Sequence, residues 1–202
     1  MLIDFQKLSP RESYPWLVNS INPRPIAWVS TISAAGETNL APFSFFQGVC
    51  ANPPTLLFTV ANDRHGKKKD TLVNVEEVPE FVVNLVPYAL RDPMNLTSAP
   101  LPHGESEFDK FKIATTASTH VSPPRVALSP VALECKLDRI VRVGEGPLAG
   151  NVVFGTVLCV QVDPAVLGAD GQIDPRKLDT IGRMGGDYYT RTTELFSITR
   201  PT

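Results

Sequence analysis

Proline is the residue that most restricts the fold of this chain, because it occurs 19 times in 202 residues. Average usage is about 5%, so this proportion is roughly twice the norm. Proline has no backbone N–H group; it therefore breaks helices and cannot donate a hydrogen bond within a sheet. Such a density favours many short elements joined by turns. We predict a mainly β fold rather than a helical bundle.

The apolar pattern predicts six or seven strands. Residues 26–32 alternate between two faces, as a strand requires, and a hairpin turn is expected at residues 34–37. The returning segment Thr38–Phe46 should change from strand to loop at Pro42. The remaining expected strands are Thr55–Ala61, Glu80–Val86, Val131–Asp138 and Asn151–Asp163. Turn signals between these strands indicate a small antiparallel β-barrel.

Helices are expected to be few and short. The prolines near the N-terminus leave room only for a helical turn at Pro10–Tyr14. Asp70–Glu77 has the apolar spacing of a helix, with Asp70 or Thr71 as its N-cap. Weaker helical segments are Leu90–Ser98, Ser106–Phe111 and Pro175–Met184, and the tail from Gly185 is expected to be irregular but anchored. Length and composition predict a single domain over residues 1–202.

Composition argues against several classes of function. The net charge of −2 provides no positive field, so neither nucleic acid nor a membrane is an expected partner. The longest apolar run, Val152–Val162, is too short to span a bilayer. The N-terminal sequence MLIDFQKL lacks the pattern of a signal peptide. We therefore expect a cytoplasmic protein.

The cysteines do not indicate a metal site. Cys50, Cys135 and Cys159 include no CxxC pair, and no His and Cys residues have the spacing of metal ligands. We expect all three to be buried as small apolar side chains, with a redox role for Cys50 as the alternative. No metal is predicted.

A run of lysines before a helix is the strongest signal of a binding site. Lys67, Lys68 and Lys69 precede the helix predicted from Asp70. A helix N-terminus carries unpaired N–H groups and a partial positive charge, so it suits a phosphate group. Lys69 would add a full charge and Thr71 a hydroxyl donor. The alternative is a solvated, charged surface.

The segment Asn39–Phe46 offers the complementary walls. Its small residues let the backbone approach a flat ligand, and Ser44 can hydrogen-bond a heteroatom. Phenylalanines 43, 45 and 46 supply apolar surface, as in pockets for mononucleotides. The alternative is that these phenylalanines are only part of the core.

The order and spacing of several motifs resemble one known family. RPIAWVST, NLAPFSFF, NPPTLLFTV, KKKDTLVNVEE and EFVVNLV follow one another as they do in the flavin reductase-like family of FMN-binding split-barrel proteins. The later motifs LPHGESEFDKF, PPRVALSPVALEC and IGRMGGDYY extend the resemblance over nearly the whole chain. The resemblance implies a six-stranded Greek-key antiparallel barrel, a homodimer, and FMN held near the dimer interface.

The resemblance also implies roles for individual residues. The phosphate of FMN would be surrounded by Ser30, Thr31, Lys69, Asp70 and Thr71. The isoalloxazine edge would be lined by Ala41, Ser44 and Phe45, with Asn39 and Asn84 near the pocket floor or the ribityl chain. Arg183 would reach the phosphate or the partner subunit, unless it forms a surface salt bridge, and His103 either contacts substrate or serves loop structure.

The implied activity is that of an FMN-dependent oxidoreductase of the NAD(P)H:flavin reductase type. NADH or NADPH would be the electron donor, and an unknown acceptor or a partner oxygenase would receive the electrons. The chemistry would reside in the cofactor, so no protein residue is expected to be catalytic. Two alternatives remain open at this point. One is a flavoredoxin-like electron carrier that holds FMN tightly, and the other is a non-catalytic flavin-binding or sensing module.

Overall fold

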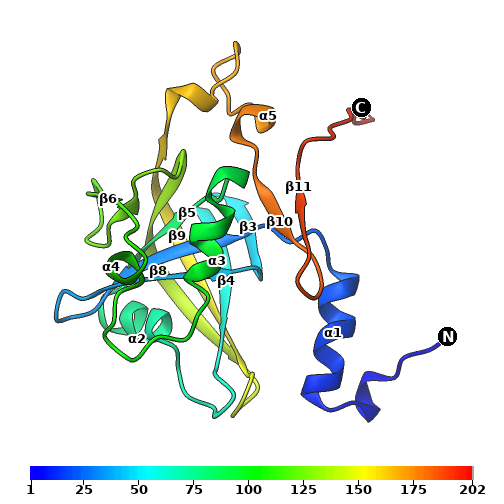
Figure 1. Ribbon diagram of the computed structural model, residues 1–202. Helices are drawn as coiled ribbons and strands as arrows, with labels where there is room; N and C mark the ends of the chain where they lie inside the picture. Colours follow the sequence, from blue (N-terminus) through cyan, green and yellow to red (C-terminus); the bar gives the residue numbers. More distant parts are fainter. Residues whose placement is uncertain (202) are drawn as a thin grey trace.

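A seven-stranded antiparallel sheet organises the structure, a computed structural model that describes residues 1–201 (Figure 1). The strands lie in the order β2-β1-β5-β8-β9-β4-β3. Their bounds are β1 Ala27–Ile32, β2 Thr38–Phe43, β3 Phe46–Ala51, β4 Pro54–Ala61, β5 Glu80–Asn84, β8 Val131–Val143 and β9 Gly150–Val162. The two edge strands, β2 and β3, are consecutive in sequence, and only Ser44 and Phe45 separate them. The predicted mainly β, antiparallel fold is confirmed; its seven-stranded sheet agrees with the six or seven strands expected from the apolar pattern and has one strand more than the resemblance implied.

Short elements cover the sheet and its ends. Two small hairpins are formed by β6 Thr115–Thr116 with β7 Arg125–Val126, and by β10 Ile181–Arg183 with β11 Tyr189–Arg191. The helices are α1 Pro10–Ser20, α2 Asp70–Glu77, α3 Arg91–Leu96, α4 Glu107–Lys110 and α5 Pro175–Leu178. Single 3-10 turns are η1 Phe5–Lys7, η2 Tyr88–Leu90 and η3 Pro164–Val166. Among the described residues, no helix has both the length and the apolar character needed to cross a bilayer.

Helix α1 is longer than the prolines suggested. A helical turn ending at Tyr14 was expected, but the helix continues through Pro15 to Ser20. Ser9 and Glu12 form a capping box, and Pro10 occupies the first turn, where its missing N–H group is harmless. Because these contacts stabilise the first turn of the helix, the loss of one backbone hydrogen bond at Pro15 does not end the helix. The expectation of a single turn was therefore wrong.

Pro42 likewise does not end its strand. The prediction of a loop there was wrong, because β2 continues to Phe43 and Pro42 pairs with Trp28. The N–H group of Leu40 points away from β1, to the Glu107 carboxylate at 2.8 Å. Pro42 lies two residues further on an edge strand, so it also faces away from the ladder and needs no N–H group.

The C-terminal region also differs from the prediction. A helix was expected over Pro175–Met184, but α5 ends at Leu178 and Asp179 adopts a left-handed conformation (φ 51°). The chain then enters β10, which pairs with β11 in the tail that was expected to be irregular. The Asp179 carboxylate holds Arg191 through two hydrogen bonds of 2.6 Å, so the hairpin is fastened to the end of the helix.

The cysteines occupy three different environments. Cys135 is buried in the main core, and burial raises the pKa of its thiol. Cys159 is half-buried, and Cys50 is exposed on β3, where its thiol donates to the carbonyl of Pro53. The expectation of burial is confirmed for Cys135 and is wrong for Cys50, because β3 is an edge strand with its outer surface open.

Strand β1 lies between two cores. Ala27 and Val29 point into the main core, which is enclosed by the curled sheet and includes Phe58 and Phe81. On the opposite face, Trp28 packs in a second core beneath α3 and α4. The indole N–H group of Trp28 donates to the Thr97 hydroxyl at 2.9 Å, which fixes the segment after α3 against the sheet. β1 is thus buried on both sides.

Aromatic rings fill the middle of the main core. The Phe43 and Phe58 ring centroids are 5.3 Å apart, and Phe81 meets Phe58 edge-on at 5.2 Å. Gly155 on β9 lies directly over the Phe81 ring, and a Cβ atom at this position would be 2.3 Å from Cζ of Phe81. Gly155, which interrupts the longest apolar run, therefore leaves the space that the Phe81 ring occupies.

Gly155→Ala is expected to destabilise the fold, because the added methyl group must displace a fully buried ring. Overpacking of this kind costs about 1–3 kcal/mol. Urea denaturation would measure the free energy of unfolding. Gly48→Ala is the matched control, since Gly48 is also in a strand and its Cβ would meet nothing within 4 Å. Equal stability of the two variants would contradict the role assigned to Gly155.

Candidate functional site

The N-terminus of α2 offers free hydrogen-bond donors. The predicted N-cap, Asp70 or Thr71, was wrong by one or two residues: Lys69 is the N-cap residue, and its side chain makes no capping hydrogen bond. The first N–H groups with acceptors are those of Leu72 and Val73, which both bond to the Lys69 carbonyl. The N–H groups of Asp70 and Thr71 have no acceptor in residues 1–201. Unpaired N–H groups at a helix start form an anion-binding site when other groups support them.

A buried set of hydrogen bonds fixes this helix start to the sheet. The Asn39 amide on β2 donates to the hydroxyls of Thr71 and Thr31, at 2.9 and 3.1 Å. The Asn74 amide on α2 donates to Thr31 as well, at 3.1 Å. All four side chains are buried. Because the Thr71 oxygen already accepts from Asn39, its own proton is free to be donated to a ligand.

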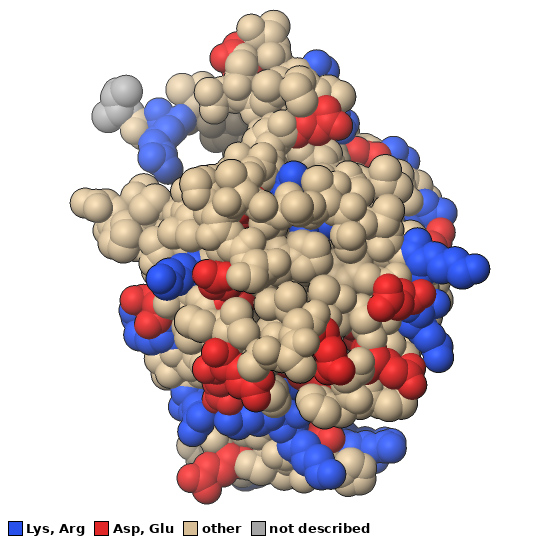
Figure 2. All heavy atoms as spheres, turned by 90° about the vertical axis from the view of Figure 1, so that its left-hand side faces the viewer, with Lys and Arg blue, Asp and Glu red and all other residues tan. Residues whose placement is uncertain are grey.

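Of these four residues, Asn39 and Thr71 line a cavity of about 420 Å³, which we call the lysine cavity. Its walls come from β2, from the start of α2 with the residues before it, and from the segment between α3 and α4. The sequence-predicted residues that line it are Asn39, Ala41, Lys69, Asp70, Thr71 and His103. Figure 2 shows the face of the molecule that carries α2 and α4, where basic and acidic side chains lie close together toward the lower end.

The three lysines are not equivalent. Lys68 forms an ion pair with Glu76 at 2.6 Å, and Arg142 shares the same carboxylate at 3.0 Å. Neither Lys67 nor Lys69 forms an ion pair with any carboxylate in residues 1–201. All three lysines line the lysine cavity, so the ion pairs alone distinguish them. Two uncompensated ammonium groups are therefore available to an anion at the start of α2.

His103 balances the one acidic side chain at the helix start. Its Nδ1 atom lies 2.8 Å from Oδ1 of Asp70, on the rim of the lysine cavity. The hydrogen bond and charge of Asp70 raise the pKa of His103 above its usual value of about 6.5. Protonated His103 neutralises Asp70, so the rim is more favourable to an anion below this raised pKa than above it.

Glu107 is a residue of the cavity that sequence reasoning missed. Its carboxylate accepts the Leu40 N–H group at 2.8 Å and is only 7% exposed. Burial is the main cause of its raised pKa. The only signal in the sequence was its place in the predicted helix Ser106–Phe111. Nothing in that pattern indicated that an edge strand 67 residues earlier would use its carboxylate.

A second cavity of about 270 Å³ adjoins the first and shares Pro42, Phe43 and Ser98 with it. We call it the serine cavity, because Ser44 lines it together with Arg183. Arg24 supports this wall from behind. Its guanidinium donates to Ser44 at 3.3 Å and to backbone carbonyls, those of Val18, Ile21 and Met184. One buried cation therefore joins α1, the Ser44 segment and the C-terminal hairpin.

Four predicted residues do not line either cavity. Thr31 lies beneath the wall, in the hydrogen-bond set of Asn39. Ser30 and Asn84 are fully buried on the far face of β1 and β5, where they bond to the carbonyl of Pro124 and the N–H group of Val126. Phe45 lies 5.9 Å from the guanidinium of Arg24. The alternation of a strand explains Ser30, since adjacent residues point to opposite faces.

Arg183 is separated from the lysines. It lines the serine cavity but not the lysine cavity. Its backbone pairs with Arg24, and its guanidinium stacks on the Tyr189 ring at 4.5 Å. The structure therefore groups Arg183 with Ser44, rather than with the residues at the start of α2.

Comparison with known proteins agrees with this architecture. The family model "Flavin reductase like domain" matches residues 19–176. A protein of Halalkalibacterium halodurans is 37% identical, with 100% of this chain and 97% of the relative covered. Among solved structures, nitrilotriacetate monooxygenase component B from Bacillus cereus has a TM-score of 0.92 at 32% identity, covering 98% of each chain. The 2-nitrobenzoate 2-nitroreductase of Pseudomonas fluorescens has a TM-score of 0.90 at 30% identity, covering 100% of this chain and 97% of that protein.

These matches span both cavities and the whole sheet. The predicted split-barrel fold is confirmed by likeness to a flavin reductase structure with a split barrel domain, from Shewanella frigidimarina. That protein has a TM-score of 0.85 at 22% identity, with 100% of both chains covered. The chain therefore belongs to the flavin reductase-like family.

Proposed function

We propose that this protein binds FMN across the lysine and serine cavities and acts as an NAD(P)H-dependent oxidoreductase of the flavin reductase type. The proposal rests on the groups that the start of α2 brings together. Unpaired N–H groups, two unpaired lysines and a free threonine proton converge there at one end of an elongated space. The other end combines apolar side chains, among them Pro42 and Phe43, with the hydroxyl of Ser44. This distribution of groups fits a ligand with a phosphate at one end and a flat ring at the other.

The phosphate end is prepared before any ligand arrives. The donors of Asp70 and Thr71 are part of the helix, and Asn39 orients the Thr71 hydroxyl from below. Lys67 and Lys69 supply charge without having to break an ion pair. Preformed donors avoid the loss of conformational entropy that mobile groups would suffer on binding.

The ring end is built from the edge strand β2 and the residue that follows it. Pro42 and Phe43 form an apolar wall shared by both cavities, Ala41 extends it in the lysine cavity, and Ser44 is held by Arg24. The two adjoining cavities, of about 420 and 270 Å³, lie in the size range of ligand pockets. These residues would orient the ring and exclude water from one of its faces.

Bound FMN would supply the redox chemistry, accepting a hydride from the donor and passing electrons on. The chain contributes binding, orientation and charge. The hydroxyl of Ser44 is a polar group beside the ring end, and its bond to Arg24 fixes its position. No side chain needs to act as a base for this reaction, so His103 is assigned to the phosphate end.

A partner oxygenase is the acceptor that we favour. The similar protein from Bacillus cereus is, by its name, component B of a nitrilotriacetate monooxygenase. The homodimer implied by the resemblance stays a prediction. Light scattering would test it, since a particle near 22.0 kDa would be a monomer.

The visible spectrum of the purified protein tests the proposed function. Added FMN should bind, and anaerobic addition of NADH or NADPH should bleach its absorbance. Binding without bleaching by either nucleotide would contradict the reductase activity and favour an electron carrier reduced by another protein. Failure to bind FMN would contradict the proposal as a whole.

Replacing Lys69 and Thr71 together by alanine is expected to weaken FMN binding at least tenfold. Each residue would lose a charge-assisted hydrogen bond to phosphate, worth about 1.5–3 kcal/mol. Fluorescence titration of FMN would measure the Kd, with circular dichroism to verify folding. Lys68→Ala is the matched control, because Lys68 is already paired with Glu76, and its Kd should change much less. An unchanged Kd in the double variant would remove these residues from the site.

FMN affinity is expected to fall as the pH rises through the raised pKa of His103. Below that pKa the imidazolium offsets Asp70; above it the aspartate faces the phosphate uncompensated. For exposed charges we expect a change of about two- to fivefold in Kd. His103→Gln should remove this part of the pH profile, whereas His120→Gln, in a distant exposed turn, should retain it. Identical profiles for wild type and His103→Gln would exclude this role.

A further inference from the structure

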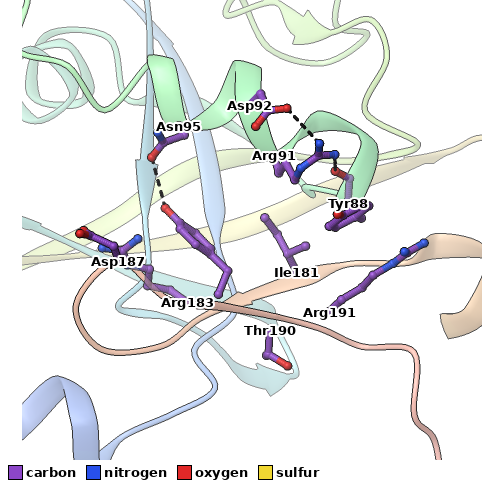
Figure 3. Close-up of a pocket in the computed structure, with 10 residues that line it drawn as sticks. Tyr88, Arg91, Asp92, Asn95, Ile181, Arg183, Asp187, Thr190 and Arg191 are labelled. Carbon is purple, nitrogen blue, oxygen red and sulfur yellow. Dashed lines mark hydrogen bonds and ion pairs between the residues drawn. The ribbon is translucent and has the colours of Figure 1, made fainter.

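A third space, whose lining residues are drawn in Figure 3, borders the serine cavity and shares no lining residue with the lysine cavity. It has a volume of about 360 Å³ and lies between the segment η2–α3 and the hairpin β10–β11. We call it the arginine recess. Asn95, Arg183 and Tyr189 line both this recess and the serine cavity, so these three side chains form the border between the two spaces. The Tyr189 hydroxyl lies 3.4 Å from Oδ1 of Asn95, which joins the hairpin to α3 along the shared border.

The outer wall of the recess is a stack of arginine, tyrosine and arginine. The guanidinium carbons of Arg91 and Arg191 lie 4.3 and 4.2 Å from the Tyr88 ring centroid. Both charges are already paired: Arg91 with Asp92 at 3.1 Å, and Arg191 with Asp179 at 2.6 Å. The charges of this wall are therefore largely balanced, and its guanidinium and phenol groups are planar. This wall suits an aromatic or other planar group rather than a bare anion.

Arg183 differs from these two arginines. No carboxylate in the described part of the chain forms an ion pair with it. Its guanidinium stacks on Tyr189, and Nη2 donates to the carbonyl of Gly186. The remaining N–H groups have no acceptor in residues 1–201. Arg183 is half-buried, so a ligand would compete with less water than at an open surface.

We propose that the arginine recess binds the second ligand of the reaction, an oxyanion joined to a planar ring, with Arg183 as the anchor for the anion. A guanidinium can hold a carboxylate or phosphate through two parallel hydrogen bonds. Arg183 lies where the recess meets the serine cavity, so the ligand would reach the ring end of the proposed FMN site. The inference depends on the proposed function only for the redox role of the ligand.

Two sources share this chemistry. One is the phosphate-bearing half of a nicotinamide nucleotide, and the other is an aromatic carboxylate that accepts electrons. Isothermal titration calorimetry with ADP-ribose and with benzoate distinguishes them without any turnover. Each probe is titrated into FMN-loaded wild type, Arg183→Gln, Arg183→Lys and the control Arg176→Gln, in which an exposed arginine of α5 is changed. The same titrations on protein without added FMN make the result independent of flavin binding.

We expect at least one probe to bind the wild type and to bind Arg183→Gln at least about tenfold more weakly, as for loss of a charged hydrogen bond. Arg183→Lys should recover part of the affinity, since it retains charge but not the planar fork. Arg176→Gln should match the wild type. The probe that loses affinity identifies the source of the oxyanion. If neither probe binds, or if both bind Arg183→Gln as well as the wild type, the inference is overturned.

The outcomes also separate this inference from the proposed function. If the protein does not bind FMN but binds a probe in a way that depends on Arg183, the recess proposal stands and the flavin proposal is overturned. The opposite result is normal FMN binding and bleaching, together with probe affinities and a KM for the nicotinamide nucleotide that are unchanged in Arg183→Gln. That result would overturn the recess proposal and retain the flavin proposal.

Discussion

The amide of Asn39 donates to two threonine hydroxyls, and this pair of hydrogen bonds ties the sheet to the start of α2. A buried amide without partners would be costly, so the two elements can pack only in the register that satisfies it. That register places the N–H groups of Asp70 and Thr71 at the cavity and turns the Thr71 proton toward it. The hydrogen bonds that satisfy these buried side chains thus also position the N–H donors of the candidate site.

At the other end of the site, a buried charged group also has to be supplied with hydrogen-bond partners, and main-chain carbonyls supply them. Arg24 is 5% exposed, and main-chain carbonyls from both ends of the chain, rather than a carboxylate, accept its hydrogen bonds. Burial is the main cause of the lowered pKa of its guanidinium, although arginine remains protonated in proteins. A cation satisfied by carbonyls keeps its positive field, which a salt bridge would cancel. Ser44 and Arg183 both lie within the influence of that field.

Local signals in the sequence predicted part of this arrangement. The lysine run and the helix from Asp70 to Glu77 are encoded within a dozen residues, and the structure forms the helix over the same residues. Asn39 and Ala41, which were expected in the facing wall, line the same cavity as the start of this helix. Contacts distant in sequence were not predictable in this way. The bond from Glu107 to Leu40, the position of Arg183 beside Ser44, and the continuation of β2 through Pro42 all depend on how separate segments pack.

Strand β1 has no side on which its residues can vary freely, since Val29 faces one core and Trp28 the other. A strand at the surface tolerates change at every second position, but this one is constrained at each position in turn. β1 also pairs with β2 and so supports the wall of both cavities. β1, the strand that supports the site, is therefore the part of the chain in which substitutions are least tolerated. Among relatives, new ligand preferences should arise in the segment between α3 and α4 and in the C-terminal hairpin, which border the same space without carrying the fold.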